Sequence, residues 1–285
     1  MPRDPAIQFR PLAEHTVAEA AAAMQHCFEG YVVPVRLTPE AWERRFRAEH
    51  LDPFASRIYH RGDAVAAVLF VTRRGWTSRV GGMGVAAAER GKGLGRRVME
   101  DAIEGARARG DRSLILEVIE QNPPAVALYR SLGFRTLRRL VGYRWTPADA
   151  GAPADPLTQV DPLEVARVAA AEGEPDLPYM LAAETVAGAS APARGYRLDD
   201  RAWALVSNPE AETLSLAALV VPRAHRRQGW GTRMTRALAA RFPGRPWMVT
   251  AIVPEDLAPG FFAAGGWERS ELSQWEMALD LRPPE

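Results

Sequence analysis

Residues 85–97 read VAAAERGKGLGRR, and residues 221–233 read VPRAHRRQGWGTR. Val85, Arg90, Gly93, Gly95 and Arg97 of the first stretch all recur in the second, each 136 positions later, as in 226 minus 90. Farther on, a glycine followed by an aromatic residue occurs at positions 133–134 and again at positions 266–267, with a spacing of 133. A loop absorbs a difference of three residues easily. Self-similarity at a fixed period indicates a structural repeat, so the chain is predicted to contain two copies of one unit.

The glycine-rich stretch has the same surroundings in both copies: an apolar strand precedes it, and a helix, another strand and a short helix follow. In the first copy the strand is Arg79–Val85 and the helix is Leu94–Arg109, which ends at Gly110. Composition and turn residues predict further strands at 7–12, 56–60, 64–72, 114–119 and 135–145, and helices at 16–28, 39–49 and 123–132. This order predicts an α/β fold (α+β), with a mixed central sheet flanked by helices.

The length of 285 residues also favours two domains, because globular domains centre on roughly 100 to 150 residues. Between Thr146 and Pro156 the chain consists almost entirely of proline, alanine, aspartate and glycine, which is typical of a solvated connection. The sequence therefore predicts an N-terminal domain at 1–146, a linker at 147–157 and a C-terminal domain at 158–285.

Charge and cysteine content exclude several classes of protein. The net charge of +1 gives no general field that would attract nucleic acid or an acidic membrane surface. No apolar run approaches the ~18 residues that would span a bilayer, and the N-terminus does not resemble a signal peptide. The single cysteine, Cys27, cannot form an intramolecular disulfide, and the five scattered histidines lack metal-ligand spacing. We therefore expect a cytoplasmic protein without a metal.

The loop 90–95 lies between a strand and a helix, so several backbone NH groups converge at the positive end of a helix dipole. Glycines at 93 and 95 remove the Cβ atoms that would block a close approach, and basic side chains supply positive charge at Arg90, Lys92, Arg96 and Arg97. This combination suits a pyrophosphate.

Two other phosphate-binding motifs fail on spacing. A Walker loop needs Ser or Thr directly after its lysine, but Gly93 follows Lys92. A dinucleotide fingerprint beginning at Gly91 would need its last glycine at position 96, which is Arg96.

Arg90, Gly93 and Gly95 resemble the (Gln or Arg)-x-x-Gly-x-(Gly or Ala) loop of the GNAT superfamily of acyl-coenzyme A N-acyltransferases. The resemblance extends over roughly Ser78 to Phe134, and it implies that strand 82–85 pairs its backbone with the pantetheine arm of acetyl-coenzyme A (acetyl-CoA). The residues that the resemblance and the loop chemistry assign to this cosubstrate are Met83, Val85, Arg90, Gly91, Lys92, Gly93, Leu94, Gly95, Arg96 and Asn122. Asn122 could equally cap the following helix.

The resemblance also implies two catalytic residues. It places the hydroxyl of Tyr129 beside the sulfur of the coenzyme, where it would act as an acid, and it makes Glu117 a candidate base, direct or through water. Tyr129 could instead simply pack its helix, and Glu117 could form an ion pair. The loop at 29–37 is where acceptor pockets of this family are built, which makes Glu29 and Tyr31 candidate substrate contacts.

The second copy keeps the glycine-rich loop but lacks the candidate catalytic residues. Phe262 stands where Tyr129 stands in the first copy and cannot donate a proton, Thr250 replaces Glu117, and Glu255 replaces Asn122. We therefore interpret the C-terminal domain as a degenerate copy that covers or shapes the acceptor site, with vestigial coenzyme binding as an alternative.

Together these observations predict an acetyl-CoA-dependent N-acetyltransferase that acts on a primary amine of a small molecule or peptide, with catalysis in the N-terminal domain. Two alternatives stay open: an acyl-CoA-binding sensor or scaffold without turnover, and a protein-modifying acetyltransferase whose second domain recognises a partner. The order of elements and the loop do not distinguish these, because a fold does not specify a substrate.

Overall fold

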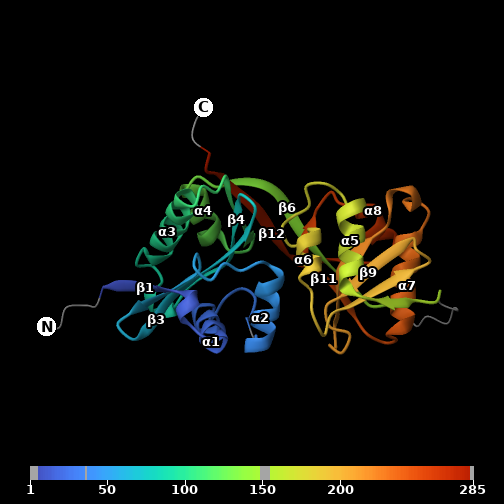
Figure 1. Ribbon diagram of the computed structural model, residues 1–285, viewed down its shortest axis with the longest axis horizontal. Coiled ribbons are helices and arrows are strands. Elements are labelled where there is room, and N and C mark those ends of the chain that lie inside the picture. Colours follow the sequence, from blue (N-terminus) through green and yellow to red (C-terminus); the bar gives the residue numbers. More distant parts are fainter. Residues whose placement is uncertain (1–5, 36, 148–154, 283–285) are drawn as a thin grey trace. The chain divides into compact units, whose positions relative to one another are not determined.

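The computed structural model describes residues 6–35, 37–147 and 155–282, and the chain divides into two compact units. The N-terminal unit comprises residues 1–137 with 275–285, and the C-terminal unit comprises residues 138–274. Each unit consists of one sheet with helices on both faces, as Figure 1 shows. This confirms the predicted α/β class and the predicted repeat.

In the N-terminal unit the sheet order is β1-β2-β3-β4-β5, followed by the end of β12, and β4 with β5 is a parallel pair. The strands are β1 (Ile7–Pro11), β2 (Arg57–Arg61), β3 (Ala64–Arg74), β4 (Thr77–Val85), β5 (Ser113–Ile119) and β12 (Glu268–Asp280). The helices are α1 (Val17–Cys27), α2 (Pro39–Ala48), α3 (Leu94–Ala108) and α4 (Pro123–Ser131), with short 3-10 turns at Leu12–Glu14 and Ala87–Glu89. From β1 to α4, every helix and strand lies within two residues of its predicted bounds.

Strand β3 holds the two helical layers of this unit together. Its side chains alternate, as the period of a strand requires: Val68 and Phe70 pack with α1 and α2, whereas Leu69 and Val71 pack with α3. Figure 1 shows α1 and α2 on one face of the sheet and α3 and α4 on the other. Because both faces are covered, the strand is a continuous apolar run.

The C-terminal unit repeats this plan with the order β7-β8-β9-β10-β11, followed by the end of β6. Its strands are β7 (Thr158–Val160), β8 (Arg194–Leu198), β9 (Ala202–Val206), β10 (Leu214–Val220), β11 (Trp247–Pro254) and β6 (Arg135–Trp145). Its helices are α5 (Pro162–Glu172), α6 (Ala183–Ala187), α7 (Trp230–Arg241) and α8 (Pro259–Ala264), with a 3-10 turn at Arg223–His225. The pair β10–β11 is parallel, as β4–β5 is in the other unit.

The last strand of each sheet comes from the other half of the sequence. Residues 135–145, which were expected to close the first domain, form the single strand β6, and from Arg138 onward it belongs to the C-terminal unit and pairs with β11. In return, β12 belongs to the N-terminal unit from Trp275 onward. The buried side chains explain this exchange, because Val141 and Tyr143 fill the core around α7 and Met277 fills the core around α3.

The units therefore differ from the predicted domains at 1–146 and 158–285, because each predicted domain gives its closing strand to the other unit. Of the predicted linker at 147–157, residues 148–154 lie outside the described part of the chain.

Candidate active site

Strands β4 and β5 separate halfway along their length. They pair in parallel only from Thr77↔Ser113 to Val80↔Leu116. On its other side β4 carries a bulge, because Phe70 pairs with Gly82 and Val71 pairs with Val80, which leaves Gly81 as the extra residue. A bulge bends its strand and ends regular pairing. The bulge and the end of the parallel pairing coincide, so the segment 82–85 with Met83 and Val85 diverges from β5 and leaves backbone groups for an extended ligand.

The loop after β4 has the backbone conformation of an anion site. Gly91 and Gly93 both adopt the left-handed region, at φ +76° and +82°, and Gly93 caps α3 without a side-chain hydrogen bond to the first turn. The first amides of α3 are therefore not covered by a capping side chain, and the helix dipole favours negative charge there. Lys92 and Gly91 are exposed, whereas Leu94 is buried in the core and anchors the start of the helix.

The first arginine of the loop acts on the protein itself. The guanidinium of Arg90 donates to the carbonyl oxygens of Val85 (Nε, 2.9 Å), Cys27 (Nη2, 3.2 Å) and Glu29 (Nη2, 2.6 Å). It therefore ties the end of β4 to the segment after α1, and its place in the motif is explained by this clamp. Arg96, on the first turn of α3, is partly exposed and donates to the Ser131 hydroxyl at 2.6 Å.

Tyr129 is buried on α4, where its ring packs at 5.9 Å from the ring of Phe134. Burial, together with nearby Tyr31, raises the pKa of the Tyr129 hydroxyl above its usual value, so this hydroxyl keeps its proton at neutral pH. Burial also raises the pKa of Tyr31, and the side chain of Asn122 acts in the opposite direction. The structure thus gathers three predicted site residues, Tyr31, Asn122 and Tyr129. Asn122 also caps α4, accepting from the amide of Ala125 at 3.4 Å.

Glu117 lies where β5 leaves β4, and an arginine already occupies its carboxylate. Arg79 Nε lies 2.8 Å and Arg79 Nη2 lies 2.7 Å from Oε2 of Glu117. The ion-pair alternative for Glu117 is thus what the structure contains.

Sequence reasoning did not identify Arg79 as a site residue. Its guanidinium also contacts a second carboxylate, with Nη1 2.7 Å from Oε2 of Glu49, and Glu49 pairs with Arg45 at 2.8 Å. The burial of Glu49 opposes its ionisation, but Arg45 and Arg79 outweigh that effect and hold its pKa below the usual value. The available signal was a charged residue at the start of the predicted strand 79–85, whose other residues are valine, glycine and methionine, because a buried arginine needs an anionic partner. Glu29, the other predicted substrate contact, has an exposed side chain.

The C-terminal unit repeats the backbone of this site. Strands β10 and β11 pair only through Leu214↔Trp247 and Ser215↔Met248, and the register of β10 with β9 leaves Ala217 as an extra residue. Ala217 lies 136 positions after Gly81, at the same spacing as the loop residues. In the second loop Gly229 has φ +83° and Arg227, which stands where Gly91 stands, has φ +62°. Arg226 repeats the clamp, with Nε 3.0 Å from the Val221 carbonyl oxygen.

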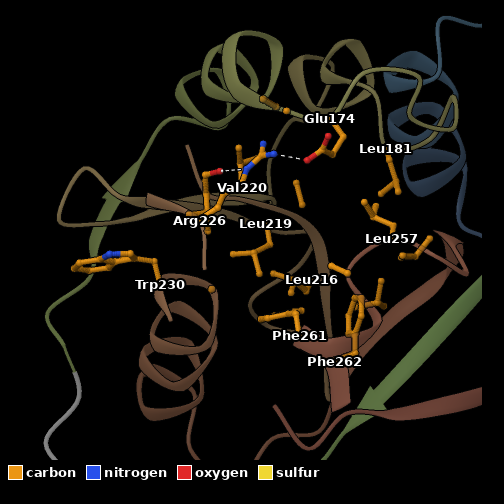
Figure 2. A pocket seen from close by; sticks show the side chains of 18 of the residues that line it. Glu174, Leu181, Leu216, Leu219, Val220, Arg226, Trp230, Leu257, Phe261 and Phe262 are labelled. Carbon is orange, nitrogen blue, oxygen red and sulfur yellow. Dashed lines mark hydrogen bonds and ion pairs between the residues drawn. The ribbon is translucent and has the colours of Figure 1, made fainter. Parts of the chain in front are cut away.

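This second site opens into a cavity of about 780 Å³, which we call the C-terminal cavity. It is bordered by the divergent parts of β10 and β11, the loop 225–232, α8 and the segment from α5 to α6. In Figure 2, Leu216, Leu257, Phe261 and Phe262 lie on one side of the pocket, the ion pair of Arg226 with Glu174 lies across from them, and the ring of Trp230 stands apart. The ring of Trp230, which is much larger than the side chain of Leu94 in the first loop, packs with two guanidinium groups. Its centroid lies 4.8 Å from Cζ of Arg201 and 4.0 Å from Cζ of Arg233.

The C-terminal cavity lacks the acid of the first site. Phe262 is buried and stacks on Tyr143 with ring centroids 3.7 Å apart. Glu255, at the position of Asn122, is engaged by Arg139 at 3.3 Å and by Arg269. His225 lines the cavity at its loop end.

Within residues 6–35, 37–147 and 155–282, no group of three or more His, Cys, Asp or Glu side chains is arranged to hold a metal ion. In the same part of the chain, no helix is both long and apolar enough to cross a membrane.

The N-terminal unit combines two diverging strands, a helix N-terminus without a side-chain cap and a buried tyrosine. Residues 19–134 match the model of the acetyltransferase (GNAT) family. N-alpha-acetyltransferase RimI of Mycobacterium tuberculosis is 34% identical over 118 residues, which are 39% of this chain and 70% of that protein. The chain belongs to the GNAT family.

One further relative matches a shorter stretch of sequence, and one solved structure matches almost the whole chain in fold. Streptothricin acetyltransferase of Streptomyces lavendulae is 40% identical over 72 residues, so the match spans 25% of this chain and only 38% of that protein. The solved structure of a tandem GNAT protein from the clavulanic acid biosynthesis pathway aligns over 98% of this chain and 100% of its own, with a TM-score of 0.65 and 20% identity. That likeness shows the fold, including its tandem arrangement.

Proposed function

We propose that the N-terminal unit transfers the acetyl group of acetyl-CoA to a primary amine of a small molecule or peptide. The observation that carries this proposal is the convergence of three features in one unit: the divergent edge of β4, the uncapped loop before α3, and the buried hydroxyl of Tyr129. The first two suit the pantetheine arm and the pyrophosphate of the cosubstrate, and the third suits its sulfur.

Binding is divided between backbone and side chains. Residues 82–85 pair with the amides of the pantetheine arm, and the amides that follow Gly93 bind the pyrophosphate with Lys92 and Arg96 beside them. Arg90 contributes indirectly, because its three carbonyl contacts hold the loop against β4 and α1.

The reaction forms a C–N bond and breaks the C–S bond of the thioester. A lysine-type amine has a pKa near ~10.4 and must arrive without its extra proton to attack the carbonyl carbon. Tyr129 keeps its proton at neutral pH and gives it to the departing sulfur, so coenzyme A leaves as the thiol. Glu117 accepts the proton that the attacking nitrogen loses, directly or through water.

The acceptor lies beside the loop after α1. Tyr31 and Asn122 supply polar contacts there, with Glu29 at the rim. The names of the relatives support an amine of either kind, because one acetylates streptothricin and the other is an N-alpha-acetyltransferase. A cytoplasmic location fits the single cysteine.

The test is acetyl-CoA consumption and thiol release with a panel of amines and peptides, comparing the unmodified chain with Tyr129→Phe. An acetylated amine and a kcat lowered by about 10²- to 10⁴-fold, with binding of acetyl-CoA retained, support the proposal. An unchanged kcat in Tyr129→Phe contradicts the role of this tyrosine.

A second candidate function is an acyl-CoA sensor without turnover. It is favoured by the C-terminal unit, which keeps the loop and a cavity but has Phe262 in place of the acid. Acetyl-CoA binding with no acetylation of any acceptor in the same panel would select this function. Acetylation of protein N-termini alone would select a protein-modifying enzyme.

A further inference from the structure

The two sites differ most at the end where the acyl group would lie. In the N-terminal unit that end carries Tyr129, Tyr31, Asn122 and the ion pair of Glu117. In the C-terminal cavity the corresponding positions are apolar or turned to other partners, with Phe262 stacked on Tyr143 and Glu255 paired with Arg139 and Arg269. A site without polar groups at its inner end does not suit a polar amine.

The inner wall of the C-terminal cavity is aliphatic and aromatic. Leu216 and Val249 come from the diverging strands β10 and β11, Phe262 comes from α8, and Leu181 and Leu257 come from loops. Leu216, Val249 and Phe262 are buried even though they line the cavity, so a ligand that reaches them leaves water. Such a surface favours a ligand with its own apolar chain.

The outer end of the same cavity has the opposite character. The loop 225–232 borders it, with Gly229 at the N-terminus of α7 and no side-chain cap on that helix. Arg226 is fixed by Val221, Glu174 and the carbonyl of Glu172, but Arg227 has no ion-pair partner among the described residues. Positive charge and amide donors at one end, with an apolar chamber at the other, match a ligand with a phosphate-bearing head and an apolar tail.

The cavity is large enough for a ligand of this kind, since about 780 Å³ lies within the roughly 300 to 1,000 Å³ that is usual for ligand sites. The apolar lining indicates the length of the tail. An acetyl group adds a single methyl group beyond the thioester and would leave the partly buried side chains of Leu181 and Leu257 without an apolar partner from the ligand. We propose that the C-terminal cavity binds a coenzyme A thioester of a medium-chain fatty acid and holds it without transferring the acyl group. This site is additional to the acetyl-transfer site, and its occupancy does not depend on the acceptor that the N-terminal unit uses.

The first test is isothermal titration calorimetry on the full chain with coenzyme A, acetyl-CoA, butyryl-CoA, octanoyl-CoA and octanoate. Each buried methylene group contributes about fourfold in affinity, so octanoyl-CoA should bind at least tenfold tighter than acetyl-CoA. Octanoate alone should bind far more weakly than octanoyl-CoA. Because acetyl-CoA also binds the N-terminal unit, the affinities are compared for the binding event that Thr232→Glu weakens. Equal affinities of acetyl-CoA and octanoyl-CoA for that site would overturn the proposal, and so would octanoate binding as tightly as its thioester.

The second test assigns the site with a matched pair of substitutions. Thr232 lines the C-terminal cavity on the first turn of α7, and Arg96 stands at the same position of α3, 136 residues earlier. A glutamate near a helix N-terminus is compatible with the helix dipole but repels a phosphate. Thr232→Glu should weaken octanoyl-CoA binding at least tenfold, whereas Arg96→Glu should leave that affinity within about twofold. The reverse pattern would place the long-chain ligand in the N-terminal unit and refute the proposal.

The third test addresses the apolar end. Leu181→Asp puts a charge on the wall of the chamber and should weaken octanoyl-CoA at least tenfold while changing coenzyme A affinity less than twofold. Equal losses for both ligands would mean that the acyl chain does not lie against this wall. When the Tyr129→Phe variant is incubated with octanoyl-CoA and the amine panel, the octanoyl-CoA should not be consumed. Its consumption would contradict the proposal that the cavity binds the thioester without transferring the acyl group.

Discussion

Nη2 of Arg79 lies 2.7 Å from Oε2 of Glu117, and both side chains are only 5% exposed. The same guanidinium reaches Glu49, so one buried cation joins strand β5 to the end of α2 through β4. Arg79 precedes the bulge at Gly81 by two residues, which places this ion pair at the point where β4 and β5 begin to diverge. The ion pair therefore holds the side chain of the candidate base at the point where the two strands separate.

Replacement of Arg79 by leucine should lower the free energy of unfolding by about 3 to 5 kcal/mol, because it removes a shared cation from two buried carboxylates. Urea denaturation measures this change. The control is Arg47→Leu, which breaks an exposed pair with Glu43 and should change stability by less than about 0.5 kcal/mol. A loss below about 1 kcal/mol in Arg79→Leu would show that the carboxylates do not depend on this guanidinium.

Glu49 should make the chain sensitive to acid. Its pKa lies below the usual value of 4.5, because Arg45 and Arg79 outweigh the burial that opposes its ionisation. A carboxyl group whose pKa is lowered by folding contributes stability that is complete above its unfolded pKa and is lost as the pH falls through its folded pKa. Tm should therefore decrease as the pH is lowered below about 4.5. Glu49→Gln should be less stable than the unmodified chain at pH 7, but its Tm should decrease less on acidification.

The control for this pH series is Glu43→Gln, since Glu43 is exposed and its pair with Arg47 is on the surface. Its Tm should follow that of the unmodified chain at pH 7, 5, 4 and 3. An acid-induced loss of Tm in Glu49→Gln as steep as in the unmodified chain would exclude Glu49 as a source of acid sensitivity.

Local sequence patterns were sufficient to predict the helices and strands of the first copy and its glycine-rich loop. Helix α1 begins at a Thr16 cap that is paired with Glu19, and α3 begins after a glycine with positive φ, so their ends are determined by neighbouring residues. The loop glycines were found for the same reason, because a left-handed residue before a helix requires a particular local chemistry.

Features that depend on contacts between residues far apart in the sequence could not be predicted from the sequence. Residues 135–145 have the pattern of a strand whichever sheet they join, and only the packing of Val141 and Tyr143 shows that β6 completes the C-terminal unit. The partners of Arg79 lie 30 and 38 positions away, so its network left no local pattern. The bulge at Ala217 was equally hidden, although its spacing of 136 from Gly81 follows the repeat.

The pH dependence of acetyl transfer should show that Tyr129 stays protonated. Burial and nearby Tyr31 raise the pKa of its hydroxyl above the usual value of 10.0, so kcat should not fall between about pH 7 and pH 9 through loss of this proton. Steady-state rates with saturating amine measure this. In Tyr129→Phe, kcat should be low across the range, whereas Tyr143→Phe, in the C-terminal unit, should behave like the unmodified enzyme. A fall in kcat centred near pH 8 that is absent from Tyr129→Phe would mean that this hydroxyl loses its proton in the working range, contrary to its burial.

The two loops offer a matched test of which unit catalyses. Gly93 and Gly229 have φ of +82° and +83°, and in both cases an added Cβ would meet nothing within 4 Å, so alanine at either position incurs the same backbone strain of about 1 kcal/mol. The two substitutions therefore differ only in whether the added methyl group meets the bound cosubstrate. Gly93→Ala should raise the KM for acetyl-CoA about tenfold, equivalent to about 1.4 kcal/mol of binding, whereas Gly229→Ala should leave that KM unchanged. Steady-state kinetics and urea denaturation on both variants separate binding from stability. If both variants lose the same stability but only Gly229→Ala raises the KM for acetyl-CoA, acetyl transfer takes place in the C-terminal unit. Backbone strain cannot explain such a difference, because it is the same at both positions.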